Sequence, residues 1–96
     1  MNKNLKAPDT DFLFEAVLTL KSVDECYNFF EDLCTASEIR EFSRRFAVAK
    51  MLSEKKSYNE IIGETGLSTA TISRVNTCLK YGAGGYVLAL ERTSKK

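Results

Sequence analysis

The sequence predicts an all-α fold of about six helices, two of which form a helix-turn-helix. Two observations favour this fold class. Apolar residues recur at helical spacing along most of the chain. Three of these apolar stripes are accompanied by a Ser or Thr with Glu three residues later, a pattern typical of a helix N-terminus. With 96 residues and 44% hydrophobic content, the chain suits one compact domain, residues 1–96, with a modest core.

The first helix is predicted over residues 10–20. Pro8-Asp9 marks its start. The apolar residues that follow keep helical spacing: Phe12, Leu13, Ala16, Val17 and Leu20. This helix is apolar enough to need a packing partner.

A second helix follows the capping box of Ser22 and Glu25, and a third follows that of Thr35 and Glu38. The second carries a stripe rich in aromatic residues, which we expect to be buried along its length: Val23, Cys26, Tyr27, Phe29, Phe30 and Leu33. The third has a polar side with four cations: Arg40, Arg44, Arg45 and Lys50. The N-terminal helices therefore span residues 10–52, and residues 53–56 form a polar connection.

Residues 57–80 carry the helix-turn-helix. Ser57 and Glu60 form a capping box for its first helix. Gly66 suits the positive φ that commonly ends a helix, and Ser68 is a suitable N-cap for the second helix. The apolar residues of that second helix share one face: Ile72, Val75 and Leu79. After a glycine-rich turn, a short C-terminal helix is predicted over residues 84–92.

The opposite face of the second helix carries small or hydroxylated side chains: Thr69, Ala70, Ser73 and Thr77. Such side chains let a helix lie deep in a major groove and offer hydrogen bonds to phosphates and base edges. Helix-turn-helix units also serve as plain packing motifs. The pattern alone therefore leaves DNA binding and simple packing both open.

Charge is distributed unevenly along the chain. The overall net charge of +1 argues against a protein that coats nucleic acid without specificity. Residues 1–38 carry a net charge of −5, residues 39–56 carry +4 and residues 57–96 carry +2. The basic part thus contains the helix-turn-helix, although the same polarity could instead hold the two halves of the fold together.

The composition argues against several other classes of function. A chain without histidine is poorly equipped for acid-base or nucleophilic catalysis, so we predict no enzyme and no catalytic residue. Cys26, Cys34 and Cys78 have no metal-binding spacing, so no metal or cofactor is expected, and we interpret them as buried thiols in a reducing cytosol. No signal peptide or membrane span is recognised, which favours a cytoplasmic protein.

Residues 37–80 resemble the tryptophan repressor superfamily, and the run ATISRVNTCLKYGAGGY resembles its YerC/YecD branch of Trp-repressor-like proteins. The most specific parts are Thr71-Ile72-Ser73-Arg74 and Leu79-Lys80-Tyr81-Gly82, and the likeness extends from about Val23 to Arg92. It implies an intertwined homodimer whose N-terminal helices interlock. It also implies that the two helix-turn-helix units face successive major grooves of double-stranded DNA, at a roughly palindromic operator. The implied function is that of a sequence-specific transcriptional regulator, most often a repressor.

Carried onto this sequence, the resemblance implies base-facing positions at Thr69, Ala70 and Thr71, with phosphate contacts from Ser73 and Lys80. None of these supplies Arg to guanine, or Asn or Gln to adenine. Sequence discrimination would then be modest and would depend on bridging waters, thymine methyl groups and DNA shape. The alternative is a helical protein- or RNA-interaction module that uses the helix-turn-helix for packing.

The resemblance also implies where an effector would bind. In the tryptophan-binding members two arginines hold the ligand, and those positions correspond here to Arg44 and Arg74. Those members have a glycine beside the second arginine, and this chain has Val75 at that position. They also have a hydroxyl that helps hold the ligand, and Cys78 replaces it here. A β-branched side chain would intrude on a flat ring, which argues against tryptophan and leaves any small-molecule effector unknown. The two arginines could instead bind another small anion, a DNA phosphate or acidic residues of the protein itself.

Overall fold

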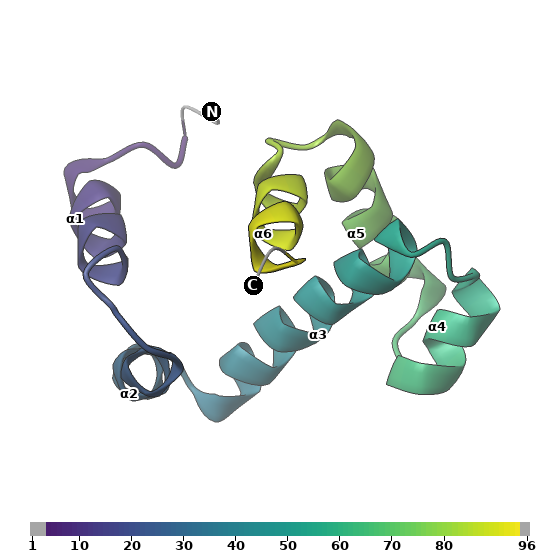
Figure 1. The fold of residues 1–96 in the computed structure, drawn as a ribbon, viewed down its shortest axis with the longest axis horizontal. Helices are drawn as coiled ribbons and strands as arrows, with labels where there is room; N and C mark the ends of the chain where they lie inside the picture. The colour runs from purple at the N-terminus through teal and green to yellow at the C-terminus, as the bar shows by residue number, and fades with distance from the viewer. Residues whose placement is uncertain (1–3, 95–96) are drawn as a thin grey trace. The chain divides into compact units, whose positions relative to one another are not determined.

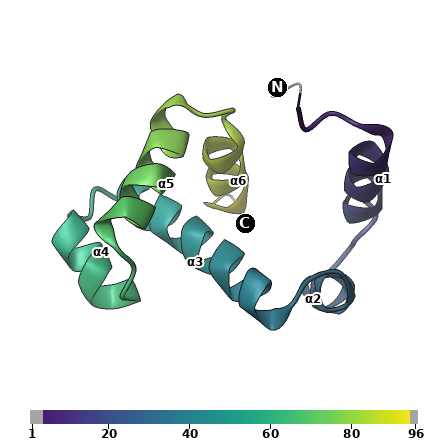
Figure 2. The same cartoon turned by 180° about the vertical axis from the view of Figure 1, so that it is seen from behind.

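Six helices make up the regular structure of the computed structural model, which describes residues 4–94 (Figure 1). Seen from the front and from behind (Figure 2), they are α1 (Pro8–Val17), α2 (Val23–Leu33), α3 (Ala36–Ser53), α4 (Tyr58–Thr65), α5 (Thr69–Tyr81) and α6 (Gly85–Ser94). Residues 4–94 contain no strand, so the prediction of an all-α fold with about six helices is confirmed.

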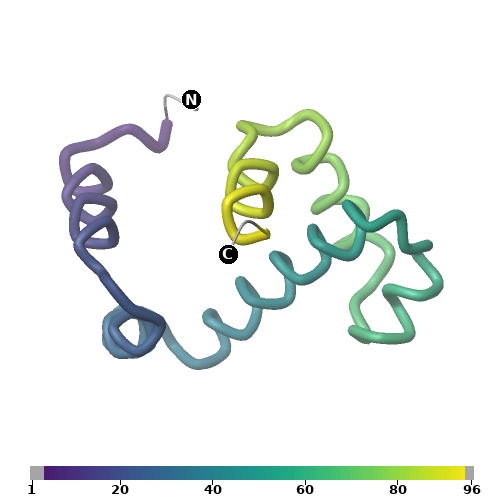
Figure 3. Tube along the Cα trace, viewed as in Figure 1, coloured from purple at the N-terminus to yellow at the C-terminus, as the bar shows by residue number. Residues whose placement is uncertain are grey.

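The chain divides into two compact units, Met1–Ile39 and Arg40–Lys96, and the boundary between them falls inside α3. The first unit holds α1, α2 and the start of α3. The second holds the rest of α3 together with α4, α5 and α6. Figure 3 follows the backbone through these elements, from purple at the N-terminus to yellow at the C-terminus.

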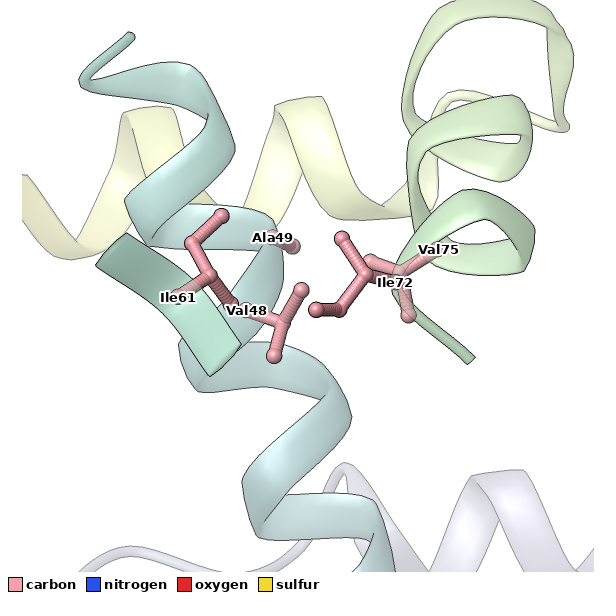
Figure 4. Close-up of a cluster of buried hydrophobic side chains, with 5 residues drawn as sticks. All are labelled: Val48, Ala49, Ile61, Ile72 and Val75. Carbon is pink, nitrogen blue, oxygen red and sulfur yellow. The ribbon is translucent and has the colours of Figure 1, made fainter. Parts of the chain in front are cut away.

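A small apolar core holds the second unit together. Its five side chains are at most 2% exposed and come from three helices: Val48 and Ala49 of α3, Ile61 of α4, and Ile72 and Val75 of α5. Figure 4 shows these side chains directed toward one another between the helices. Because the cluster takes residues from both helices of the helix-turn-helix, it fixes α4 and α5 on α3.

Two of the three predicted capping boxes form completely. The amide of Glu60 donates to Ser57 Oγ over 3.2 Å, and the amide of Ser57 donates to Glu60 Oε1 over 3.1 Å. Thr35 and Glu38 make the same pair of bonds: the amide of Glu38 donates to Thr35 Oγ1 over 3.1 Å, and the amide of Thr35 donates to Glu38 Oε1 over 2.8 Å. Each carboxylate accepts a backbone hydrogen bond from its cap residue, which holds the pKa of Glu38 and of Glu60 below the ordinary value.

The capping box predicted at the start of α2 is only half formed. The amide of Glu25 donates to Ser22 Oγ over 3.1 Å, as expected. The carboxylate of Glu25, however, accepts from the amide of Lys21, also over 3.1 Å, rather than from that of Ser22. The prediction was therefore correct for the cap residue and wrong for the return bond, which goes one residue further back along the chain.

The ends of the first and last helices also differ from the predictions. The first helix runs over Pro8–Val17 rather than 10–20, and the last over Gly85–Ser94 rather than 84–92. Proline fits the first position of a helix, where its missing amide costs no hydrogen bond. Beyond Val17 the helical turn is tighter, because the amide of Thr19 donates to the carbonyl three residues earlier, that of Ala16, over 3.0 Å. The hydroxyl of Thr19 donates to the same oxygen over 2.6 Å.

Burial in the first unit is the largest departure from expectation. The aromatic stripe of α2 was predicted to be buried, yet α1 and α2 contain no buried residue, and Val23 and Tyr27 are 67% and 64% exposed. The thiols were also predicted to be buried, but Cys26 and Cys78 are exposed and Cys34 is half-buried. Both predictions are wrong for a single chain, because within residues 4–94 even Phe29 and Phe30 of the stripe are only half-buried.

Within residues 4–94, no helix has the length and apolar character that crossing a membrane would require.

Candidate nucleic-acid interface

The turn between α4 and α5 is built by local backbone chemistry. Gly66 adopts a φ of +71°, the left-handed conformation predicted for it, and its amide bonds the carbonyl of Ile62 at 2.8 Å. Thr65 closes the turn from both sides, because its hydroxyl donates to the carbonyl of Ile61 and accepts from the amide of Leu67. The chain therefore leaves α4 in one fixed direction and enters α5 at Thr69, after a connection of three residues.

Ser68 caps α5, as predicted, by accepting a hydrogen bond from the amide of Thr71 over 3.2 Å. On the inner side of the helix, Ile72 and Val75 are buried in the core, and Leu79 is half-buried. The cap and these apolar contacts fix both the position and the rotation of α5, so the opposite face is presented outward.

Four of the five residues proposed to touch DNA lie exposed on α5: Thr69, Ala70, Ser73 and Lys80. The fifth, Thr71, is half-buried, and its hydroxyl lies 3.1 Å from Ser68 Oγ. That hydroxyl is therefore already engaged in the helix cap. The structure brings the first four residues to one exposed side of α5 and places Thr71 at the edge of that side.

The electrostatic character of α5 suits an anionic partner. Its thirteen residues include Arg74 and Lys80 but no Asp or Glu. Neither cation forms an ion pair with a residue in the range 4–94. Lys56, just before α4, is instead paired with Glu64 at 3.0 Å, and that hydrogen bond raises the pKa of Lys56. Arg74 and Lys80 thus keep their charge without an ion pair in the described part of the chain, whereas Lys56 is paired.

Arg44 and Arg74 were predicted to hold a small anion, a DNA phosphate or acidic residues of the protein itself. Both are exposed, and no ion pair joins either of them to an acidic residue between positions 4 and 94. No acidic residue in that range therefore acts as an ion-pair partner of either arginine. Val75, the β-branched residue predicted to intrude on a flat ligand ring, is only 2% exposed and lies in the core.

An apolar groove in the second unit was not foreseen from the sequence. It has a volume of about 670 Å³, and apolar side chains of three helices line much of it: Phe46 of α3, Leu79 of α5, and Val87 and Leu90 of α6. The ring of Phe46 also stacks on Tyr86, with 6.3 Å between the ring centroids. Neither Arg44 nor Arg74 lines this groove, so it is separate from the predicted effector residues.

Sequence reasoning also overlooked Tyr81, the last residue of α5, whose side chain is 83% exposed. Its position in the sequence contained a usable signal, since it follows Thr77 by four residues and Ala70 by eleven and so shares their helix face.

No group of His, Cys, Asp and Glu side chains within residues 4–94 is arranged to hold a metal ion.

Comparison with known proteins relates the whole fold to one family. The sequence model of the family described as Trp repressor protein matches residues 9–94. An uncharacterized protein of Bacillus subtilis, YerC, is 50% identical over 91 residues, which cover 95% of this chain and 88% of that protein.

Two crystal structures match the fold, each with a TM-score of 0.92. The first is a TrpR-like protein from Eubacterium eligens, which is 53% identical, with 97% of this chain and 96% of that chain covered. The second is a candidate Trp repressor from Staphylococcus aureus, which is 44% identical, with 100% and 97% covered. At these identities the similarity extends to sequence as well as to the arrangement of helices.

Proposed function

We propose that this chain, which belongs to the Trp repressor family, is a transcriptional regulator that binds double-stranded DNA through its helix-turn-helix. The observation that carries the proposal is the exposed side of α5. That side lacks any carboxylate, presents Lys80 and Arg74 without an ion-pair partner within residues 4–94, and is held outward by the buried Ile72 and Val75. Such a helix can approach phosphates without like-charge repulsion.

In this proposal the first turn of α5 enters the major groove. Thr69 and Ala70 face base edges, and the small Ala70 permits a close approach and contact with a thymine methyl group. Ser73 and Lys80 contact phosphates, which fix the register of the helix on the duplex. Thr71 contributes mainly by bonding Ser68 Oγ at 3.1 Å, so it positions the start of the helix as well as facing the groove.

We also propose that the protein acts as a homodimer. The exposed faces of α1 and α2 and the groove lined by Phe46, Leu79, Val87 and Leu90 are apolar surfaces that a second copy can cover. Residues 1–38 carry a net charge of −5, whereas residues 39–96 carry a net charge of +6. Opposite charge on the two parts of the chain favours pairing the first part of one copy with the second part of another.

A dimer of this kind places two copies of α5 on successive major grooves, about one helical turn apart, and therefore reads a palindromic site. Repression follows if that site overlaps a promoter. We place the protein in the cytoplasm, where the three free cysteines, Cys26, Cys34 and Cys78, remain reduced.

A second candidate function is a protein- or RNA-interaction module. The apolar groove of about 670 Å³ favours it, because an apolar peptide or helix could bind there instead of a second copy. In that case the helix-turn-helix would serve only for packing.

The dependence of binding on salt separates the two candidates. If Lys80 and Arg74 of both subunits each neutralise one phosphate, the affinity for duplex DNA should fall about a hundredfold between about 50 and 200 mM salt. An apolar protein interface should hardly respond over that range. Fluorescence anisotropy of a labelled duplex across the salt series measures this, and a flat response would contradict DNA binding through these cations.

A further inference from the structure

Tyr81 has no role in the function proposed so far. It is the last residue of α5, and 83% of its surface is exposed. A tyrosine combines a large apolar ring with a hydroxyl that donates and accepts hydrogen bonds, and such side chains are typical of contact surfaces that are partly apolar and partly polar. A ring held this openly at the end of the helix-turn-helix suggests a partner.

The position of Tyr81 around the helix indicates which partner. At 3.6 residues per turn, Ala70, Thr77 and Tyr81 fall within a narrow sector of α5. That sector is opposite the buried Ile72 and Val75. Tyr81 therefore continues the face on which Ala70 lies, which is the face proposed to meet DNA.

Distance along the helix indicates which part of the DNA it meets. Eleven residues at 1.5 Å per residue place Tyr81 about 16 Å along the axis from Ala70. The major groove is about 12 Å wide. If Ala70 lies within the groove, Tyr81 is beyond its edge and faces the sugar-phosphate backbone.

The turn that follows keeps Tyr81 in this place. The amide of Gly82 bonds the carbonyl of Cys78 at 2.9 Å and ends the helix. A Cβ atom at Gly82 would clash with that same carbonyl oxygen, so the chain can turn this sharply only with glycine here. The chain then turns into α6, and the ring of Tyr81 is left uncovered.

We propose that Tyr81 is a DNA-backbone contact, in which its hydroxyl donates a hydrogen bond to a phosphate oxygen and its ring lies against the adjacent sugar. DNA is favoured over a protein partner because the cations Arg74 and Lys80 are exposed on the same helix, which has no carboxylate. This inference rests on the proposed DNA-binding function and adds to it a contact that needs no charge.

The test compares four variants with the wild-type chain: Tyr81→Phe, Tyr81→Ala, Lys80→Ala and Tyr58→Phe. Affinities are measured for a preferred duplex and for an unrelated duplex of equal length, at several salt concentrations. We expect Tyr81→Ala to weaken binding to both duplexes by about tenfold, and Tyr81→Phe to lose much of the same factor, since a hydrogen bond to a charged group is removed. Tyr58→Phe removes a hydroxyl from a half-buried residue of α4 that packs against the core, and it should leave DNA affinity unchanged.

The salt series distinguishes Tyr81 from a cation. The slope of log affinity against log salt should be unchanged in both Tyr81 variants, and it should fall by about one phosphate equivalent per subunit in Lys80→Ala. Melting curves should confirm that all variants are folded.

Each contrary outcome has a distinct meaning. Failure of the wild-type chain to bind any duplex would overturn both the proposed function and this inference. Weakening by Lys80→Ala with no effect of either Tyr81 variant would overturn the role of Tyr81 alone. An effect of Tyr81→Ala confined to the preferred duplex would also overturn it, because a backbone contact acts on all sequences alike.

Discussion

Tyr27→Asp should convert the protein from a dimer to a monomer. Tyr27 is 64% exposed in the single chain and lies on the apolar face of α2, beside Val23. Tyrosine is among the residues enriched at interface hot spots, whose loss costs about 2 kcal/mol or more. A two-fold interface contains the residue twice, so the loss should be about 4 kcal/mol, which is roughly a thousandfold in the dimer dissociation constant.

Asn28→Asp is the matched control for this substitution. Asn28 is the adjacent residue, it is exposed, and the substitution introduces the same carboxylate on the polar face of α2. Sedimentation equilibrium should give a dimer for the wild-type chain and for Asn28→Asp, and a monomer for Tyr27→Asp at the same concentration. Tyr27→Asp should also lose most of its DNA affinity, since a monomer engages only one half-site. Equal dimerisation of both variants would show that α2 is not in the interface.

Ala70→Asp should abolish DNA binding without unfolding the protein. Ala70 is exposed in the first turn of α5, where the proposed groove contact is closest. A carboxylate there would face phosphates, and such a like-charge contact costs about 3 kcal/mol or more, which corresponds to a loss of at least about a hundredfold in affinity. An acidic residue near a helix N-terminus is favourable for the helix itself, so the melting temperature should not fall.

Ala36→Asp separates this local effect from the change in net charge. Ala36 is exposed and begins α3, so the variant places the same new charge in the first turn of a different helix. Its DNA affinity should remain near the wild-type value. A comparable loss in both variants, measured by anisotropy at one salt concentration, would indicate that the net charge of the chain and not the face of α5 determines DNA binding.

Local features of this fold were predictable from the sequence because their causes are local. The caps at Ser57 and Ser68 and the left-handed Gly66 each depend on residues within one helical turn. The buried face of α5 was equally predictable, since the helical spacing of Ile72 and Val75 identifies it directly.

Features that depend on distant parts of the chain, or on a second chain, were not predictable in the same way. The apolar groove joins Phe46 to Val87 and Leu90, and no sequence pattern links these positions. The aromatic stripe of α2 was identified correctly as apolar, but the single chain does not bury it. Periodicity shows that a face needs covering, and it does not show what covers it.

Within the proposed site, the sequence identified the exposed side of α5 but not the engagement of Thr71 or the position of Tyr81. The hydroxyl of Thr71 is hydrogen-bonded to that of Ser68, and only the side-chain geometry reveals this. Tyr81 was passed over because it adjoins a glycine-rich turn, although its spacing from Thr77 and Ala70 places it on the same face.

The most direct test of sequence-specific DNA binding is selection from genomic DNA. The purified protein is mixed with sheared DNA from its own source at near-physiological salt, with and without free tryptophan, and the retained fragments are sequenced. The account predicts enrichment of a few fragments with palindromic half-sites about one helical turn apart. It also predicts the same fragments in both conditions, because we expect the β-branched Val75 to exclude a flat tryptophan ring. No enrichment in either condition would contradict it and favour the protein-interaction function.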